Sequence, residues 1–323
     1  MRKKTFIGAC LAALSLAAVP LSATAQNYPT RVIKFIVPFA AGSATDSVAR
    51  ILGSKMSETL GQPIIVENMA GASGVIAAQN VARAAPDGYT VLITTNTTHA
   101  ANQSMLKKVP YDAVADFEPI TKLGTVGLAL IANPSVPASN VQELLAYAKA
   151  NPGKLTFGSG NSSSRIAGEM LKTLGGIDIL NVPYRSTPQA ITDILGGQIS
   201  LVFADIWTTL PQIKAGTVKG LAISAAQRSK LAPELPTMTE AGVPGYDLSA
   251  WSAAFVPAKT PKPIVEKLHA AFTEALSDKA VQEQFYAAGS EPESSTPEEL
   301  KAFVVSETRK WADIVKAAGI QPE

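Results

Sequence analysis

The chain has 323 residues, 46% of them hydrophobic, and this length favours two lobes over a single hydrophobic core. One cysteine and two distant histidines exclude a disulfide framework and a thiolate or histidine metal site, so we expect no metal and no cofactor. The 28 Lys and Arg nearly balance the 26 Asp and Glu, and removing the three cations among the first 25 residues changes the net charge to −1. Nucleic-acid binding therefore lacks its electrostatic footprint.

The N-terminus has the pattern of a secretory signal peptide. A basic start at Arg2, Lys3 and Lys4 precedes an apolar stretch over residues 6–19, and the small-residue run Ala23-Thr24-Ala25 follows. The apolar stretch is shorter than the roughly 20 residues that a membrane-spanning helix requires. We therefore predict cleavage after Ala25 and export of the remaining residues to the periplasm.

Alternating strand and helix patterns follow along the chain. A strand over 32–39 leads through an uncharged loop into a helix that ends at Gly61, and the same style recurs with strands at 63–68 and 90–94. Further on we expect a helix over 141–150 capped by Ser139 or Asn140, strands at 155–157, 179–183 and 199–204, and a helix with Thr187 as N-cap. Such βαβ order predicts an α/β fold with a parallel sheet.

The C-terminal third is predicted to be helical, over residues 263–276, 279–288 and from 296 onward. Thr296 and Glu299 form a capping box at the last of these helices. Its apolar face should pack the tail back onto a lobe; this face consists of Leu300, Phe303, Val304, Trp311, Ile314 and Val315.

Three predicted strand ends lead into stretches without any charged side chain, at residues 37–45, 88–106 and 155–164. The first and third open helices, and a helix N-terminus presents unpaired backbone N–H groups with a partial positive charge. Since ligands bind at the carboxyl ends of parallel strands, we expect these loops to form a pocket for an anion. The alternative is that their Ser, Thr and Asn residues only cap helices.

Sequence motifs for catalysis are absent. No G-x-S-x-G elbow, phosphate loop, G-x-G-x-x-G or H-E-x-x-H occurs in the chain. The serine-rich loop at 159–164 leaves one enzymatic alternative open, a secreted hydrolase with Ser162 as nucleophile and His99 as base. His269 lies in a predicted amphipathic helix and is expected to pack or to face solvent.

Several short motifs together resemble the tripartite tricarboxylate transporter receptor family, also called Bug proteins. These motifs are Tyr28-Pro29, the run from Ile36 to Gly42 with Thr45-Asp46, Val66-Glu67-Asn68, Gly71-Ala72-Ser73-Gly74, the run from Pro86 to Thr90, the run from Val182 to Arg185, and Gly196-Gly197-Gln198. The resemblance implies an α/β periplasmic binding protein of type II, in which two lobes enclose a ligand cleft. It implies a receptor, not an enzyme.

The resemblance also implies which residues hold the ligand carboxylate. The first-lobe loop matches residues 39–46 and the second-lobe loop matches residues 161–164. The expected ligand-binding residues are Phe39, Ala41, Gly42, Ser43, Asp46, Thr95, Thr97, Asn161, Ser162, Ser163, Ser164, Tyr184, Arg185 and Asp205. Arg165 and Arg185 depart from the common family pattern, and either could pair with a second ligand carboxylate or be a solvated or lobe-bridging charge. Asp205 either faces the cleft or caps a helix.

The expected organisation follows from these assignments. Lobe 1 should comprise residues 28–125 and 255–323 and lobe 2 residues 126–254, with hinges near 124–127 and 251–257. The receptor, a monomer, would capture a small organic carboxylate and deliver it to membrane permease subunits. Dicarboxylates, tricarboxylates, aromatic acids and acidic amino acids all remain open. A third class, the ligand-binding half of a transcription regulator, is disfavoured by the signal peptide and the lack of a basic DNA-binding segment.

Overall fold

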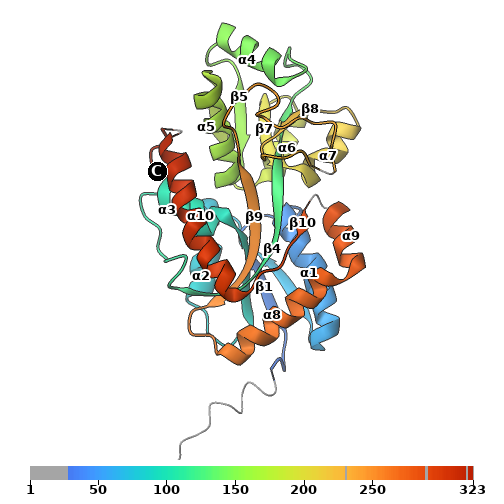
Figure 1. The fold of residues 1–323 in the computed structure, drawn as a ribbon, viewed down its shortest axis with the longest axis vertical. Coiled ribbons are helices and arrows are strands. Elements are labelled where there is room, and N and C mark those ends of the chain that lie inside the picture. Colours follow the sequence, from blue (N-terminus) through green and yellow to red (C-terminus); the bar gives the residue numbers. More distant parts are fainter. Residues whose placement is uncertain (1–27, 230, 288–289, 318, 323) are drawn as a thin grey trace, which may run out of the picture.

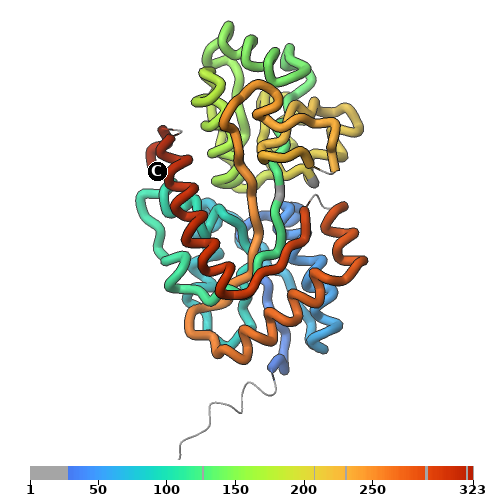
Figure 2. The backbone as a smooth tube through the Cα atoms, viewed as in Figure 1, coloured from blue at the N-terminus to red at the C-terminus, as the bar shows by residue number. Residues whose placement is uncertain are grey.

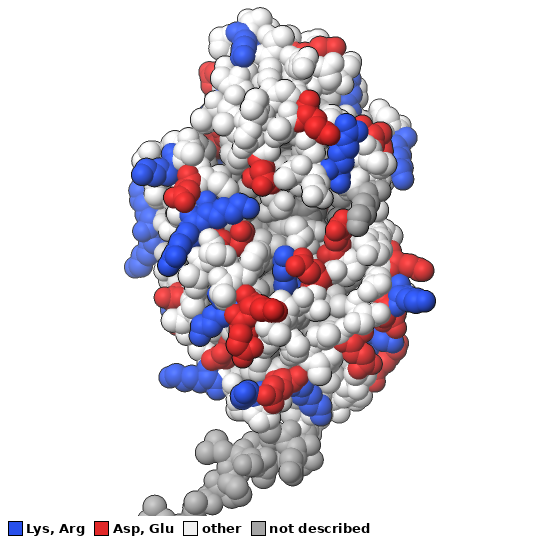
Figure 3. All heavy atoms as spheres, in the orientation of Figure 1, with Lys and Arg blue, Asp and Glu red and all other residues white. Residues whose placement is uncertain are grey.

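The computed structural model describes residues 28–229, 231–287, 290–317 and 319–322, without the side chains of Val126 and Trp207. The predicted signal peptide, residues 1–25, lies outside these residues. Two α/β lobes, one above the other in Figure 1, are joined by long strands. No helix within the described ranges has both the length and the apolar character needed to cross a bilayer. On the face in Figure 3, basic and acidic side chains are interspersed.

The lower lobe in Figure 1, called lobe 1, has a mixed sheet with strand order β2-β1-β3-β9-β4. β1 (Ile33–Val37) pairs in parallel with β2 (Ile64–Asn68) and with β3 (Thr90–Thr95). The helical segments of this lobe are α1 (Ala44–Leu60), η2 (Ala72–Gly74), α2 (Val75–Ala82), the π-helical turn η3 (Thr97–Ala101), α3 (Asn102–Met105), α8 (Lys262–Ser277), α9 (Lys279–Ala287) and α10 (Pro297–Ala317).

The upper lobe, called lobe 2, contains a second sheet. β5 (Thr156–Ser159) pairs in parallel with β6 (Leu180–Pro183) and β7 (Leu201–Asp205), and β8 (Lys219–Ile223) pairs with β4. Its helices are α4 (Val141–Ala150), α5 (Ser162–Gly175), α6 (Thr187–Leu195) and α7 (Ile206–Lys214). The parallel strands and helices agree with the predicted βαβ units.

Two antiparallel strands connect the lobes, and neither was predicted. β4 (Phe117–Ala132) and β9 (Ser249–Pro257) pair from Phe117 opposite Pro257 to Gly127 opposite Ser249. Beyond Gly127, β4 leaves β9 and pairs with β7 and β8 in lobe 2. Figure 2 shows both strands running between the lobes. The prediction of a parallel sheet is therefore wrong for this central part, where β9 also runs antiparallel to β3.

The cores explain why the predicted helices form. On α1, Val48, Leu52 and Met56 make the buried stripe. This stripe belongs to a cluster with Phe35 of β1 and Phe272 of α8, whose rings stack with centroids 5.5 Å apart. Burial of such side chains is the main stabilising contribution to each lobe.

The helix caps separate a confirmed prediction from a wrong one. Thr296 N donates to Glu299 Oε2 (2.9 Å) and Glu299 N donates to Thr296 Oγ1 (3.1 Å), which confirms the capping box of α10. The last helix then packs on lobe 1 through its predicted face, of which Trp311 is fully buried. The N-cap of α6, by contrast, is Ser186 and not Thr187. The one-residue difference reflects the extended backbone of Ser186, which is the conformation that a cap requires.

Candidate ligand site between the lobes

The first-lobe loop connects β1 to α1 and is held by one carboxylate. Asp46 accepts hydrogen bonds from Gly42 N (2.9 Å) and Asn68 Nδ2 (2.9 Å), and it forms an ion pair with Arg50 (2.9 Å). Burial by itself raises the pKa of Asp46, but the hydrogen bonds from Arg50, Gly42 and Asn68 outweigh it and leave this pKa below its ordinary value. The predicted ligand residue Asp46 therefore acts within the loop, where it fixes the backbone around Gly42.

The second-lobe loop connects β5 to α5 and is fixed by a reciprocal cap. Ser164 N donates to Asn161 Oδ1 (2.8 Å), while Asn161 N and Gly160 N both donate to Ser164 Oγ (3.2 and 3.0 Å). Two of the predicted site residues, Asn161 and Ser164, thus shape the N-terminus of α5. The helix geometry leaves the N–H groups of its first residues without intrahelical acceptors.

Direct hydrogen bonds between described residues join the lobes across the cleft. Asn96 Nδ2 donates to Ser163 Oγ (2.7 Å), Ser162 Oγ donates to Asn102 Oδ1 (2.9 Å), and Ala40 N donates to Ser186 Oγ (3.3 Å). The side chains of these two Asn–Ser pairs are all buried. Ser162 and Ser163 thus make direct contacts between the two lobes.

Asn96 and Asn102 were not among the expected ligand-binding residues, although both lie in the uncharged stretch 88–106. Trp251 N of the connecting strand β9 donates to Asn96 Oδ1 (3.2 Å), and Asn102 Nδ2 donates to Ser73 O (2.9 Å). These bonds fix the orientation of both amides. Asn96 therefore presents a donor to lobe 2, and Asn102 presents an acceptor.

A cavity of about 310 Å³ lies between the lobes beside the start of α5. Lobe 2 lines it with Ser159, Gly160, Asn161, Ser162, Arg165, Asn181, Pro183, Tyr184 and Arg185. Arg165 and Arg185 are the charged side chains among the described lining residues. Burial and the Asp193 acceptor raise the pKa of Tyr184 to about 12, so that this phenol is neutral. The described lining of this cavity therefore includes positively charged side chains and no carboxylate.

Lobe 1 lines the same cavity with Ala72, Ser73, Met105 and Leu106. Ala72 and Ser73 have φ of 47° and 51°, in the left-handed region, and glycines with positive φ flank them at both ends. Non-glycine residues rarely adopt this conformation, and strained backbone concentrates at binding sites. The motif from Gly71 to Gly74 thus forms a tight turn that places Ala72 and Ser73 in the wall.

The predicted site residues divide into two groups. Asn161, Ser162, Tyr184 and Arg185 line the cavity. The others lie outside its lining, at strand ends, in η3 and in the two loops; they are Phe39, Ala41, Gly42, Ser43, Asp46, Thr95, Thr97, Ser163, Ser164 and Asp205. Thr97 Oγ1 is buried and has no hydrogen-bond partner among the described residues. Asp205 ends β7 at the N-cap of α7, where its side chain makes no capping hydrogen bond.

The geometry contradicts a Ser162–His99 pair. His99 is fully buried in lobe 1 between Phe255 and Phe117, with ring centroids 4.0 and 4.7 Å apart. Burial lowers its pKa to about 3, and its Nδ1 lies 2.9 Å from Thr98 Oγ1. Ser162 donates its proton to Asn102 instead. No group of three or more metal-ligating side chains occurs in the part of the chain that the structure describes.

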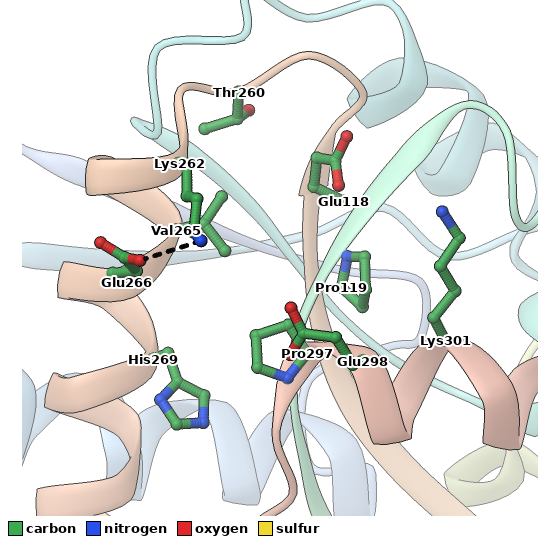
Figure 4. Close-up of a pocket in the computed structure, with 10 residues that line it drawn as sticks. All are labelled: Glu118, Pro119, Thr260, Lys262, Val265, Glu266, His269, Pro297, Glu298 and Lys301. Carbon is green, nitrogen blue, oxygen red and sulfur yellow. Dashed lines mark ion pairs between the residues drawn. The ribbon is translucent and has the colours of Figure 1, made fainter.

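A larger cavity of about 650 Å³ lies in lobe 1, between α8 and the start of α10 (Figure 4). Glu118, Glu266 and Glu298 line it together with Lys262 and Lys301, and Lys262 is paired with Glu266 at 3.6 Å. It therefore lacks an excess of positive charge, and lobe 2 contributes no residue to it. The smaller cavity between the lobes fits an anionic ligand better.

Comparison with known proteins bears on the fold and the class of protein. BugT of Bordetella pertussis is 35% identical over 316 residues, which cover 97% of this chain and 96% of BugT. The structure of R. palustris Rpa4515 with adipate superposes with a TM-score of 0.90 at 33% identity, covering 92% of this chain and all of that one. MatC of Rhodopseudomonas palustris with bound malate superposes with a TM-score of 0.85 at 34% identity, over 89% of this chain and all of MatC.

These similarities decide the fold and the class of protein. The fold is that of the periplasmic solute-binding proteins, with two lobes around a cleft. The protein is a binding receptor and not an enzyme, so the hydrolase alternative is wrong. The family model described as "Tripartite tricarboxylate transporter family receptor" matches residues 48–320. The chain therefore belongs to the tripartite tricarboxylate transporter receptor family, whose members are periplasmic.

Proposed function

We propose that this receptor captures a small organic carboxylate between its lobes and delivers it to the membrane permease of a tripartite transporter. The observation that carries the proposal is the cavity between the lobes, in which Arg165 and Arg185 are the charged residues among the described lining. A guanidinium group binds a carboxylate through charge-assisted hydrogen bonds. Adipate and malate, the ligands of two structural neighbours, are both small carboxylates.

The two loops would cooperate in holding the ligand. The N-termini of α1 and α5 each provide backbone N–H groups and a partial positive charge, and both favour an anion. In the first-lobe loop, Ala40 N donates to Ser186 Oγ of lobe 2 at 3.3 Å, so this loop borders lobe 2. Thr97 Oγ1, which is buried and has no hydrogen-bond partner among the described residues, would offer a further hydroxyl.

Capture would proceed by closure of the lobes. The strands β4 and β9 connect the lobes, so bending where β4 leaves β9 near Gly127 and Ser249 would open the cleft. We propose lobe boundaries at residues 28–125 with 255–323 and at 126–254, cleavage after Ala25, and a monomeric receptor. Ligand binding stabilises the closed form only because both lobes contact the ligand there.

A panel of organic acids tests the proposal. The exported chain, starting at Gln26, is melted in the presence of mono-, di- and tricarboxylates, aromatic acids and acidic amino acids. A ligand at about 100 times its dissociation constant adds roughly 2.7 kcal/mol of stability, which raises the melting temperature by a few degrees. An acid that raises the melting temperature and also binds stoichiometrically in calorimetry supports the proposal. A complete panel without any shift contradicts it.

A further inference from the structure

The cavity between the lobes has two unlike walls. The described lobe 1 wall consists of the apolar residues Met105, Leu106 and Ala72, whose one side-chain acceptor is the weak thioether sulfur of Met105, and of the polar Ser73. Met105 is 2% exposed and packs beneath this wall, whereas Leu106 is partly exposed and Ala72 is exposed. A ligand group that rests on this wall loses water and gains few hydrogen bonds in return.

On the lobe 2 wall, the hydroxyl protons are already used within the protein. Ser159 Oγ donates to Asn181 Oδ1 (2.7 Å), and Tyr184 donates its phenolic proton to Asp193 Oδ2 (2.7 Å). Ser162 Oγ donates to Asn102 Oδ1 (2.9 Å) across the cleft. A hydroxyl has one proton, so these three oxygens can accept from a ligand but cannot donate to its carboxylate. The charged donors on this wall are therefore the guanidinium groups of Arg165 and Arg185.

From these two walls we infer that the ligand is an amphipathic acid, with its anionic group on the arginine side of the cavity and an unsubstituted hydrocarbon body against Met105 and Leu106. The inference rests on the proposed function and narrows it. A hydroxyl group on the side of the ligand body that faces Met105 and Leu106 would have no side-chain partner there. Pockets of this kind discriminate against an added hydroxyl by roughly tenfold to hundredfold in affinity.

Isothermal titration of the exported chain with matched acids tests the inference. Hexanoate is compared with gluconate, and adipate with galactarate; in each pair the carbon chain and the charge are the same and only the hydroxyl groups differ. We expect the plain acid to bind roughly tenfold to hundredfold more tightly in at least one pair, and the hydroxylated acid to be weaker in both.

Two other outcomes overturn the inference. If gluconate or galactarate binds as tightly as its plain partner, the apolar wall does not select the ligand, although the receptor function stands. If none of the four acids binds, the inference also fails, and the wider acid panel decides the receptor function separately.

Substitutions locate the two walls. Leu106→Asn should reduce the ratio of the affinity for the plain acid to that for the hydroxylated acid, because it places a polar side chain of similar size in the apolar wall. Leu180→Asn is the matched control, since Leu180 is 51% exposed on β6 and outside the cavity. An unchanged preference in Leu106→Asn would overturn the assignment of the wall.

Arg185→Gln should weaken the plain and the hydroxylated acid by the same factor, because both carry the carboxylate. Arg83→Gln, at an exposed arginine outside the cavity, is the control and should leave both affinities unchanged. Equal affinities in Arg185→Gln and in the unmodified protein would remove Arg185 from ligand recognition.

Discussion

Asp205 shows how the environment of one residue changes its chemistry. Its carboxyl lies at the end of β7, and burial raises its pKa to about 6 from an ordinary value of 3.8. Compared with the unfolded chain, the folded protein thus favours the protonated form of Asp205. The favourable contribution of protonated Asp205 to the free energy of unfolding is fully present below about pH 3.8. It is lost as the pH rises through 6.

Asp205→Asn removes that dependence. We expect the Asn variant to melt at a higher temperature than the unmodified protein at pH 7, and the difference to shrink toward pH 4, where the unmodified carboxyl is protonated. Melting temperatures measured from pH 4 to pH 8 check this. Asp313→Asn, at an exposed residue of α10, controls for the loss of one negative charge. A constant difference between Asp205→Asn and the unmodified protein at all these pH values would contradict the expectation.

Four asparagines show which residues could be predicted from the sequence. Asn161 and Asn140 were identified as candidate loop and cap residues because local spacing determines a helix cap, and both side chains accept from the backbone three residues on. Asn96 and Asn102 have equally polar side chains. Their roles depend on Ser162 and Ser163, more than 55 positions away, so no local pattern distinguishes them.

At the scale of elements, α5 rests on β5 through a glycine. A Cβ atom at Gly168 would lie 2.1 Å from Phe157 Cε2, well inside the contact distance of two carbon atoms. Phe157 is fully buried, so its ring cannot move without disturbing the core of lobe 2. Close approach of helix and strand therefore requires glycine at this position.

Gly168→Ala is expected to destabilise the protein by about 1–3 kcal/mol, because overpacking outweighs the gain of about 1 kcal/mol in helix propensity. The midpoint of urea unfolding measures the change. Gly196→Ala is the matched control, since its nearest neighbour would be 3.5 Å from the added atom and its φ is −78°. A midpoint equal to or above that of the unmodified protein would show that β5 and α5 separate readily.

At the scale of the whole molecule, hydrogen bonds connect the C-terminal helix to the cleft. Glu307 Oε2 accepts from Trp251 Nε1 (2.9 Å) and from Trp311 Nε1 (3.0 Å), so α10 is tied to β9. Trp251 N then orients Asn96, which donates to Ser163 in lobe 2. The contacts between the lobes are therefore supported by β9, one of the two strands that connect the lobes.

The Asn102–Ser162 bond should hold the empty receptor closed. Asn102→Ala and Ser162→Ala each remove it, and we expect each to lengthen the mean distance between the lobes, with the double variant adding little because both act on one bond of about 1 kcal/mol. Spin labels on Asn80→Cys and Lys149→Cys, one exposed site in each lobe, report this distance in a chain whose only native cysteine, Cys10, precedes Gln26.

Ser306→Ala serves as the control, because its hydroxyl donates to Phe303 O within α10 and crosses no cleft (2.8 Å). Distance distributions that are the same in Asn102→Ala, Ser162→Ala and Ser306→Ala would show that this bond does not contribute to closure. A strictly additive double variant would show that the two residues act separately.

The sequence by itself determined the parallel βαβ units, most helix bounds, the capping box of α10, the uncharged loops and the resemblance to the receptor family, because periodicity and caps are local properties of the chain. Only the tertiary structure decided that β4 and β9 cross between the lobes, that Asn96 and Asn102 meet the serines of α5, and that Arg165 and Arg185 share a cavity with Met105 and Leu106. These are contacts between distant segments, and the packing of whole lobes determines them.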